Sequence, residues 1–182
     1  MLDADDPQPY RARRILVAGV SGAGKTTLAR RIATRLELPH TEIDALYHGP
    51  GWTPRPTFLD DVLALVAAPA WVTEWQYASA RPLLAEAADL MVWLDPPFRQ
   101  TMARITRRTL RRRLRREELW NGNVEPPLWT VFTDRDHVWR WSIRTRREYD
   151  ELVPAAAAAN PALVVVRLRS QAEVERWLAR LT

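Results

Sequence analysis

The stretch that decides the fold is Gly19-Val-Ser-Gly-Ala-Gly-Lys-Thr26, which matches the pattern G-x-x-x-x-G-K-[ST] at every position. It follows the apolar run Arg14-Ile-Leu-Val-Ala18, typical of a buried strand, and precedes apolar residues at helical spacing over 28–38. Glycines allow such a turn to place backbone N–H groups around phosphates, and the helix N-terminus adds partial positive charge. The sequence therefore predicts nucleotide binding at a strand–loop–helix junction.

Each residue type in this loop has an expected role. Lys25 would place a compact charge between the β- and γ-phosphates, and the Thr26 hydroxyl would bind Mg²⁺, so ATP and Mg²⁺ are the expected cofactors. Lys25 is also the single lysine beside 26 arginines, and a planar guanidinium would fit a crowded loop poorly. The predicted nucleotide-binding residues are Gly19, Val20, Ser21, Gly22, Ala23, Gly24, Lys25, Thr26 and Thr27.

Composition excludes several protein classes. With 182 residues, 47% of them hydrophobic, the chain is long enough for one folded domain and too apolar to be disordered. The absence of cysteine excludes disulfides, thiolate metal sites and a cysteine nucleophile. A single lysine excludes both the Asn-Lys-x-Asp signature of guanine-specific GTPases and the separate strand lysine of protein kinases. The N-terminus lacks a signal-peptide core and the longest apolar run, 63–72, contains Pro69, so we expect a cytoplasmic protein without a membrane partner.

Strand-like and helix-like segments alternate along the chain. This order predicts an α/β fold, a three-layer P-loop arrangement with a five-stranded parallel sheet. In a phosphoryl-transfer enzyme, the arginine-rich helix would resemble the hinge into a helical lid. We expect one domain over 1–182, with its core at about 13–98 and 160–182 and the lid at about 99–155. The expected strands are 14–18, 41–44, 71–74, 90–94 and 163–168. The expected helices are 28–38, 57–68, 79–88, 98–118, 134–153 and 171–181.

The charge is unevenly distributed, because residues 1–98 carry twelve acids against nine bases, whereas 99–182 carry eighteen arginines against ten acids. Nine of these arginines fall within 99–116, a segment without any acid. Most of them would form a solvated or salt-bridged face, but two or three would act on a transferring phosphoryl group. Arg108 and Arg112 are our candidates. Arg140, Arg144 and Arg147 form a second candidate group on the next helix.

Two acids compete for a role on the side where a phosphoryl acceptor would bind. Asp44 follows the expected second strand, where it would deprotonate a hydroxyl or hold Mg²⁺ through water; the alternative is a helix cap. Glu74 ends the next strand and could serve the same purpose or be purely structural. Trp52 and Trp75 fall nearby and could stack on a base or sugar, although core packing is the expected fate of both, as it is of Trp93 and Trp177.

The loop, Asp44, the segment Asp89–Asp95 and the arginine-rich helix together resemble the nucleoside monophosphate kinase and shikimate kinase group. The segments Ile43–Tyr47 and Pro50–Trp52 are similar, more narrowly, to small bacterial adenylate-kinase-related ATPases also called DNA topology modulation proteins. That group often has Asp-Gly-Asn-Tyr after its third strand, whereas this chain has Glu74-Trp-Gln-Tyr77, so the shape of the acceptor pocket differs.

The resemblance implies an ATP-dependent, Mg²⁺-using phosphotransferase that acts on a small hydroxyl or phosphate acceptor. Lys25, Asp44, Arg108 and Arg112 would be its catalytic residues and Thr26 its metal residue. Three alternatives remain open: a nucleic-acid-associated ATP-binding protein that uses the arginine-rich helix, a polynucleotide 5′-hydroxyl kinase, and a nucleotide-binding module without turnover. The acceptor and the oligomeric state are left open.

Overall fold

A four-stranded parallel sheet forms the centre of the molecule. The computed structural model describes residues 1–8, 11–115, 118–123, 143, 145 and 147–181. The strands are β1 (Arg14–Ala18), β2 (Trp71–Glu74), β3 (Leu90–Leu94) and β4 (Val164–Leu168). They lie in the order β2-β1-β3-β4, so the P-loop strand β1 is central, between β2 and β3.

The expected strand over 41–44 is wrong, so the described sheet has four strands rather than five. The chain does approach β2 here, because His40 forms a one-residue bridge to Val72 and Thr41 donates its N–H to the Val72 carbonyl. At Ile43 the pairing stops, since its N–H donates to the Glu74 carboxylate, 3.0 Å away, instead of to a backbone carbonyl. A side chain thus ends the ladder, and a helix begins at Ile43.

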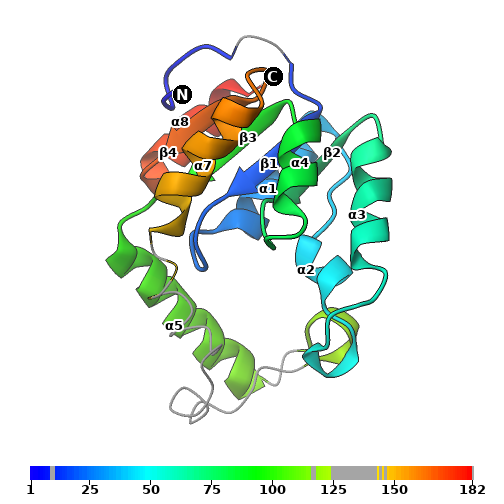
Figure 1. Cartoon of the computed structure of the whole chain (residues 1–182). Helices are drawn as coiled ribbons and strands as arrows, with labels where there is room; N and C mark the ends of the chain where they lie inside the picture. Colours follow the sequence, from blue (N-terminus) through cyan, green and yellow to red (C-terminus); the bar gives the residue numbers. More distant parts are fainter. Residues whose placement is uncertain (9–10, 116–117, 124–142, 144, 146, 182) are drawn as a thin grey trace.

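The helices cover both faces of the sheet, as a three-layer fold requires (Figure 1). The α-helices are α1 (Lys25–Leu36), α2 (Ile43–Tyr47), α3 (Phe58–Ala67), α4 (Arg81–Ala87), α5 (Phe98–Arg115), α7 (Glu148–Ala159) and α8 (Gln171–Arg180). Two short 3₁₀ turns are η1 (Pro50–Trp52) and η2 (Trp120–Gly122). Among the described residues, no helix combines the length and the apolar character that a membrane span needs.

Alternating strand residues build two separate cores. Ile15 and Val17 point toward α1 and α8, whereas Leu16 and Ala18 point toward α2, α3, α4 and α7. Every residue of β3 is buried, as expected of a strand covered on both faces. Trp93 and Trp177 are buried in the two cores, which confirms their predicted place; Trp75 is buried as well.

The observed helices differ from expectation mainly in the C-terminal half. A helix is expected over 134–153. Its residues 134–142, which include Arg140, lie outside the described part of the chain, and so does Arg144. The described helix α7 continues past the predicted end at Val153, through Pro154, to Ala159. Its alanines favour helix strongly, and Asn160 then donates its N–H to the Ala156 carbonyl at the helix end. The alanine run is therefore helical.

Asp89 connects the starts of the two central strands. Its carboxylate accepts the N–H groups of Arg13 and Arg14 and two bonds from the Arg14 guanidinium at 3.1 and 2.7 Å. Partial burial raises the pKa of the Asp89 carboxyl, but these hydrogen bonds outweigh that effect and hold the pKa below its ordinary value. The carboxylate therefore fixes β1 against β3 before either strand reaches the site.

Replacing this carboxylate should loosen the sheet. We expect Asp89→Asn to lower the free energy of unfolding by about 1–3 kcal/mol at pH 7, because charged hydrogen bonds are lost. A carboxyl whose folded pKa is depressed adds stability above its unfolded pKa and loses it as pH falls through the folded value. The difference between the two proteins in urea unfolding should therefore shrink below about pH 4. An equal difference at pH 3 and pH 7 would contradict this role.

Candidate active site at the carboxyl ends of the strands

The phosphate-binding loop has the backbone that its glycines predict. Gly19, Gly22 and Gly24 have φ values of 143°, 75° and 104°, a region that side chains disfavour. Gly22 also has no room for a side chain, since a Cβ would lie 2.5 Å from Ile105 Cγ1 and 2.7 Å from the Thr101 carbonyl oxygen. The beginning of α5 therefore packs directly onto the loop.

The helix that follows the loop begins without a cap. Gly24 occupies the N-cap position of α1, no side chain accepts a bond there, and the first turn contains no acid. By contrast, Ser170 caps α8 by accepting the Glu173 N–H at 3.2 Å. The first N–H groups of α1 thus lack partners from its own cap, which is the arrangement that binds an anion.

Lys25 is buried, with only 8% of its surface exposed, and its ammonium donates to the Val20 carbonyl oxygen at 3.2 Å. Burial lowers the pKa of Lys25 to about 8, while Asp44 and Glu74 act to raise it and Arg108 and Arg81 to lower it further. Two of the predicted catalytic residues, Asp44 and Arg108, therefore act electrostatically on Lys25. A polyphosphate in this place would stabilise the charged amine.

Glu74 lies beside the residue expected to hold a metal ion. Its side chain is almost fully buried, and burial raises the pKa of its carboxyl, but His40, the Ile43 N–H and the Thr26 hydroxyl together hold the pKa below its ordinary value. Oε2 accepts the Ile43 N–H, whereas the buried Oε1 lies 3.6 Å from His40 Nε2 and forms no hydrogen bond with a described residue. A buried carboxylate next to the Thr26 hydroxyl fits the oxygen ligands that Mg²⁺ prefers.

Asp44 lies at the start of α2 in a polar cluster that follows β2. The Tyr77 hydroxyl donates to Asp44 Oδ1 at 2.6 Å, and the Gln76 amide donates to the same oxygen at 3.0 Å. Tyr77 also contacts His48, with 3.1 Å between its hydroxyl oxygen and Nε2. The sequence did not single out Tyr77, Gln76 or His48 as site residues, although Gln76 and Tyr77 come just after the carboxyl end of β2, the end of a parallel sheet where ligands bind.

The turn η2 closes the site on the side of α2 and η1. Trp120 donates its indole N–H to Glu42 at 2.8 Å, Asn121 donates to the His48 carbonyl, and Asn123 donates to the Gly49 carbonyl at 2.9 Å. Figure 1 shows η2 beside η1, at the far end of α5 from the sheet. The segment after the arginine-rich helix is thus attached to the loop that carries His48.

The arginine-rich helix begins at the phosphate loop and runs away from it. Arg104 donates to the Ala23 carbonyl oxygen at 3.1 Å, and Arg108 acts on Lys25, whereas Arg112 lies over the Trp120 ring at 5.9 Å. The two candidates therefore face different parts of the site: Arg108 is near the phosphates' expected place and Arg112 is at η2. Four other arginines of the helix are exposed, namely Arg99, Arg107, Arg111 and Arg115.

Arg81 is a site residue that the sequence did not reveal. Its guanidinium lies over the rings of Trp75 and Tyr149, 5.6 and 5.4 Å from their centroids, and pairs with Glu148 at 2.6 Å. Its charge lowers the pKa of Lys25, so it belongs to the same electrostatic cluster. No sequence pattern indicated this role for Arg81, because its partners Glu148 and Tyr149 belong to α7, far along the chain.

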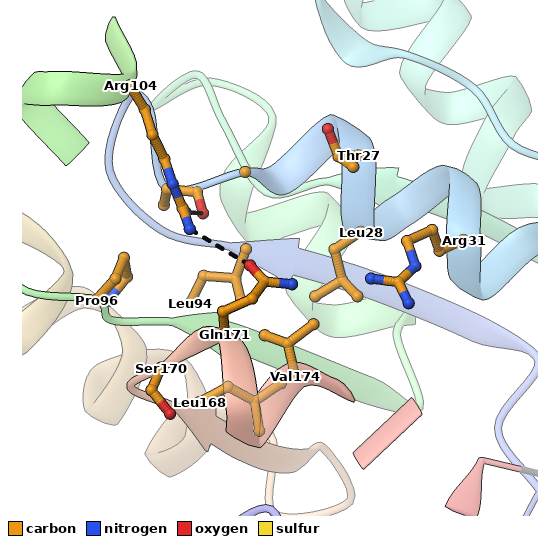
Figure 2. A pocket seen from close by; sticks show the side chains of 12 residues that line it. Thr27, Leu28, Arg31, Leu94, Pro96, Arg104, Leu168, Ser170, Gln171 and Val174 are labelled. Carbon is orange, nitrogen blue, oxygen red and sulfur yellow. Dashed lines mark hydrogen bonds between the residues drawn. The ribbon is translucent and has the colours of Figure 1, made fainter. Parts of the chain in front are cut away.

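A cavity of about 280 Å³ adjoins the phosphate loop on the other side, between α1, the start of α5 and the β4–α8 connection (Figure 2). Leu28, Leu94, Leu168 and Val174 give it an apolar lining. Its polar edge includes Arg104, which donates to Gln171 at 3.3 Å, as the dashed line in Figure 2 shows. The remaining lining residues are Ala23, Gly24, Thr27, Arg31, Pro96 and Ser170.

The fold is shared with solved structures of a gluconokinase and a shikimate kinase. A gluconokinase from Sinorhizobium meliloti 1021 aligns with a TM-score of 0.52 and 22% identity, over 93% of this chain and 91% of that one. A shikimate kinase from Acinetobacter baumannii, in complex with shikimate, aligns with a TM-score of 0.54 and 15% identity, over 93% and 90%. No family model and no curated protein sequence matches the chain. At these identities the likeness establishes a P-loop kinase fold.

The contact at Gly22 can be tested against a glycine with similar backbone and open surroundings. Gly51 has φ of 67°, and a Cβ there would meet nothing within 4 Å. We expect Gly51→Ala to lower the free energy of unfolding by about 1 kcal/mol through backbone strain alone. Gly22→Ala should cost about 1–3 kcal/mol more, because the Cβ overpacks against α5. Urea unfolding measures both, and equal losses would contradict the packing of α5 on the loop.

Proposed function

We propose that the protein transfers the γ-phosphoryl group of ATP to a hydroxyl or phosphate oxygen of a small acceptor. The observation that carries the proposal is the electrostatic cluster around Lys25. A buried lysine at the uncapped start of α1 lies within reach of two acids and two arginines. Such a cluster suits a polyanion whose terminal group must be neutralised and attacked from one side. The likeness to kinase folds over most of the chain supports the same conclusion.

ATP and the acceptor bind on opposite sides of the phosphate-binding loop. The apolar cavity beside Gly24 and Leu28 takes the base and sugar of ATP, and the triphosphate then follows the loop to Lys25. The acceptor binds on the opposite side, near Asp44, where Gln76 and Tyr77 offer polar contacts. We infer that residues 1–182 form one domain with both substrates at one edge of its sheet.

Mg²⁺ would be held by the Thr26 hydroxyl and, directly or through water, by Glu74. When bound, the ion would neutralise charge on the β- and γ-phosphates. With Glu74 assigned to the metal side, we assign Asp44 to the acceptor. Mg²⁺ is usually bound by one or two carboxylates together with waters and substrate phosphates.

The reaction requires one proton transfer and one phosphoryl transfer. The acceptor oxygen bonds to the γ-phosphorus as the bond from that phosphorus to the β–γ bridging oxygen breaks, and the electron pair of that bond leaves with ADP. Asp44 accepts the proton that a hydroxyl acceptor loses. Lys25 and Arg108 neutralise the charge that develops on the transferring group. Arg112, near η2, is assigned to the acceptor end of the lid.

Removing the lysine should abolish turnover. We expect Lys25→Ala to reduce ADP formation at least about 100-fold, and Lys25→Arg to rescue little of it, because the planar guanidinium does not fit the loop. The assay offers MgATP with a panel of sugar acids, sugars, nucleosides and nucleoside monophosphates and follows ADP. Arg176→Ala, at a surface cation paired with Asp5, is the matched control and should retain wild-type rates. Wild-type binding and turnover of ATP by Lys25→Ala would refute the mechanism.

Filling the cavity should separate the base from the triphosphate. We expect Val174→Trp to weaken ATP binding at least about tenfold, since an indole occupies the space of the base, while inorganic triphosphate binds as it does to the wild type. Leu63→Trp, at an exposed position of α3, controls for the added indole. Isothermal titration with both ligands gives the comparison. Equal weakening of ATP and triphosphate would mean that the cavity is not the nucleoside site.

A further inference from the structure

The Asp44 carboxylate is held asymmetrically. Both hydrogen bonds that it accepts, from the Tyr77 hydroxyl and from the Gln76 amide, fall on Oδ1, at 2.6 and 3.0 Å. No described residue donates to Oδ2. Two donors on one oxygen fix the plane of the carboxylate and leave the other oxygen with its lone pairs available.

The Tyr77 hydroxyl is kept as a donor by its surroundings. The Tyr77 ring stacks on Tyr47, with 3.8 Å between centroids, and its backbone is held at φ of 60°, an uncommon conformation for a bulky residue. Burial raises the pKa of the phenol, and Asp44 raises it further, so the proton stays on the oxygen at any working pH. Backbone strain of this kind persists where neighbouring contacts enforce it.

His48 completes the chain. Because the single Tyr77 proton points to Asp44, the contact between His48 Nε2 and the phenol oxygen requires a proton on Nε2, which donates across 3.1 Å. The imidazole is enclosed by Tyr47 and Trp52, each 5.0 Å away, and by Trp120 at 6.0 Å. The η2 turn adds the bond from Asn121 to the His48 carbonyl. The ring is thus held from α2, η1 and η2 at once.

We propose that Tyr77 and His48 are positioning residues of the phosphoryl transfer, which hold Asp44 Oδ1 through a hydrogen-bond chain so that Oδ2 meets the acceptor hydroxyl. The inference rests on the proposed function, which assigns Asp44 to the acceptor. The acceptor's proton moves to Oδ2 and stays there until the product leaves. No proton travels along the chain from Asp44 to His48, whose part is to orient and polarise.

The hydrogen-bond chain should also make the reaction slower at acidic pH. A second proton on His48 Nδ1 would draw electron density from Tyr77, strengthen its bond to Oδ1 and make Asp44 a weaker base. The described titratable groups that face His48 are Asp44 and Tyr47 from α2 and Tyr77 after β2, while Glu42 and Arg112 contact Trp120. Burial lowers the pKa of His48, and Asp44 partly opposes this, so the rate should decline on the acidic side of the ordinary histidine pKa.

Three variants separate positioning from packing. Tyr77→Phe keeps the stacked ring and loses the hydroxyl, His48→Gln keeps an N–H donor that does not titrate, and Tyr47→Phe is the matched control on the other ring of the stack. We expect Tyr77→Phe to lower kcat about tenfold or more, with KM for ATP within about twofold of wild type. His48→Gln should keep most of kcat at pH 8 and flatten its acidic decline. Tyr47→Phe should match the wild type in both.

Rates are measured from pH 5 to 9 as ADP formation with the acceptor that the panel identifies, or with water as acceptor. A Tyr77→Phe enzyme with unchanged kcat, or an unchanged acidic decline in His48→Gln, would overturn the proposal. So would an equal loss in Tyr47→Phe, since that would make the stack rather than the hydrogen bond responsible.

A titration of the His48 imidazole by NMR needs no turnover, so it distinguishes failure of this inference from failure of the proposed function. His48→Gln identifies the signal among the three histidines. Asp44→Asn and Tyr77→Phe should each lower the His48 pKa by about half a pH unit or more, while Tyr47→Phe leaves it unchanged. If neither variant moves it, the chain does not couple the residues and the proposal is wrong. If both variants lower the His48 pKa but no acceptor is phosphorylated, the hydrogen-bond chain is present and the proposed function is wrong.

Discussion

The contact between Gly22 and α5 is the constraint on which the site depends. A hydrogen atom at this position lets Ile105 and the Thr101 carbonyl reach the phosphate loop, and the contact fixes where α5 begins. Because Ile105, Thr101 and Thr109 are buried on one side of α5, the arginines on that helix are placed relative to the loop by packing rather than by their own charge. The position of Arg108 near Lys25 follows from this one close approach.

Lys25 shows how the site is balanced before any ligand binds. A buried ammonium is costly unless opposite charges lie near, and here Asp44 and Glu74 supply them while Arg81 and Arg108 oppose them. The pKa of Lys25 is lowered because burial and the two nearby arginines outweigh the two acids. A polyphosphate supplies the missing negative charge, which is the physical reason to connect this cluster with phosphoryl transfer.

The acceptor side was predicted in part. Asp44 was a candidate from the sequence, and the structure places it near Lys25; its strand, however, proved to be the helix α2. Period-two patterning over four residues cannot show that a side chain, Glu74, will take the N–H that a strand would have paired. Tyr77 and His48 left no pattern at all, because their meeting depends on a turn with positive φ and on η2 docking from a distant part of the chain.

The sequence by itself determined the phosphate loop, the strand before it and the helix after it, since this conformation depends on glycines and one lysine at fixed, local spacing. It also indicated buried strands such as 14–18 and 90–94 through continuous apolar runs. Tertiary structure alone decided the number of strands, the different surroundings of Asp44 and Glu74, and the inclusion of Arg81 among the charges around Lys25. Those outcomes depend on hydrogen bonds and charges between residues dozens of positions apart, and such interactions have no local signature in the chain.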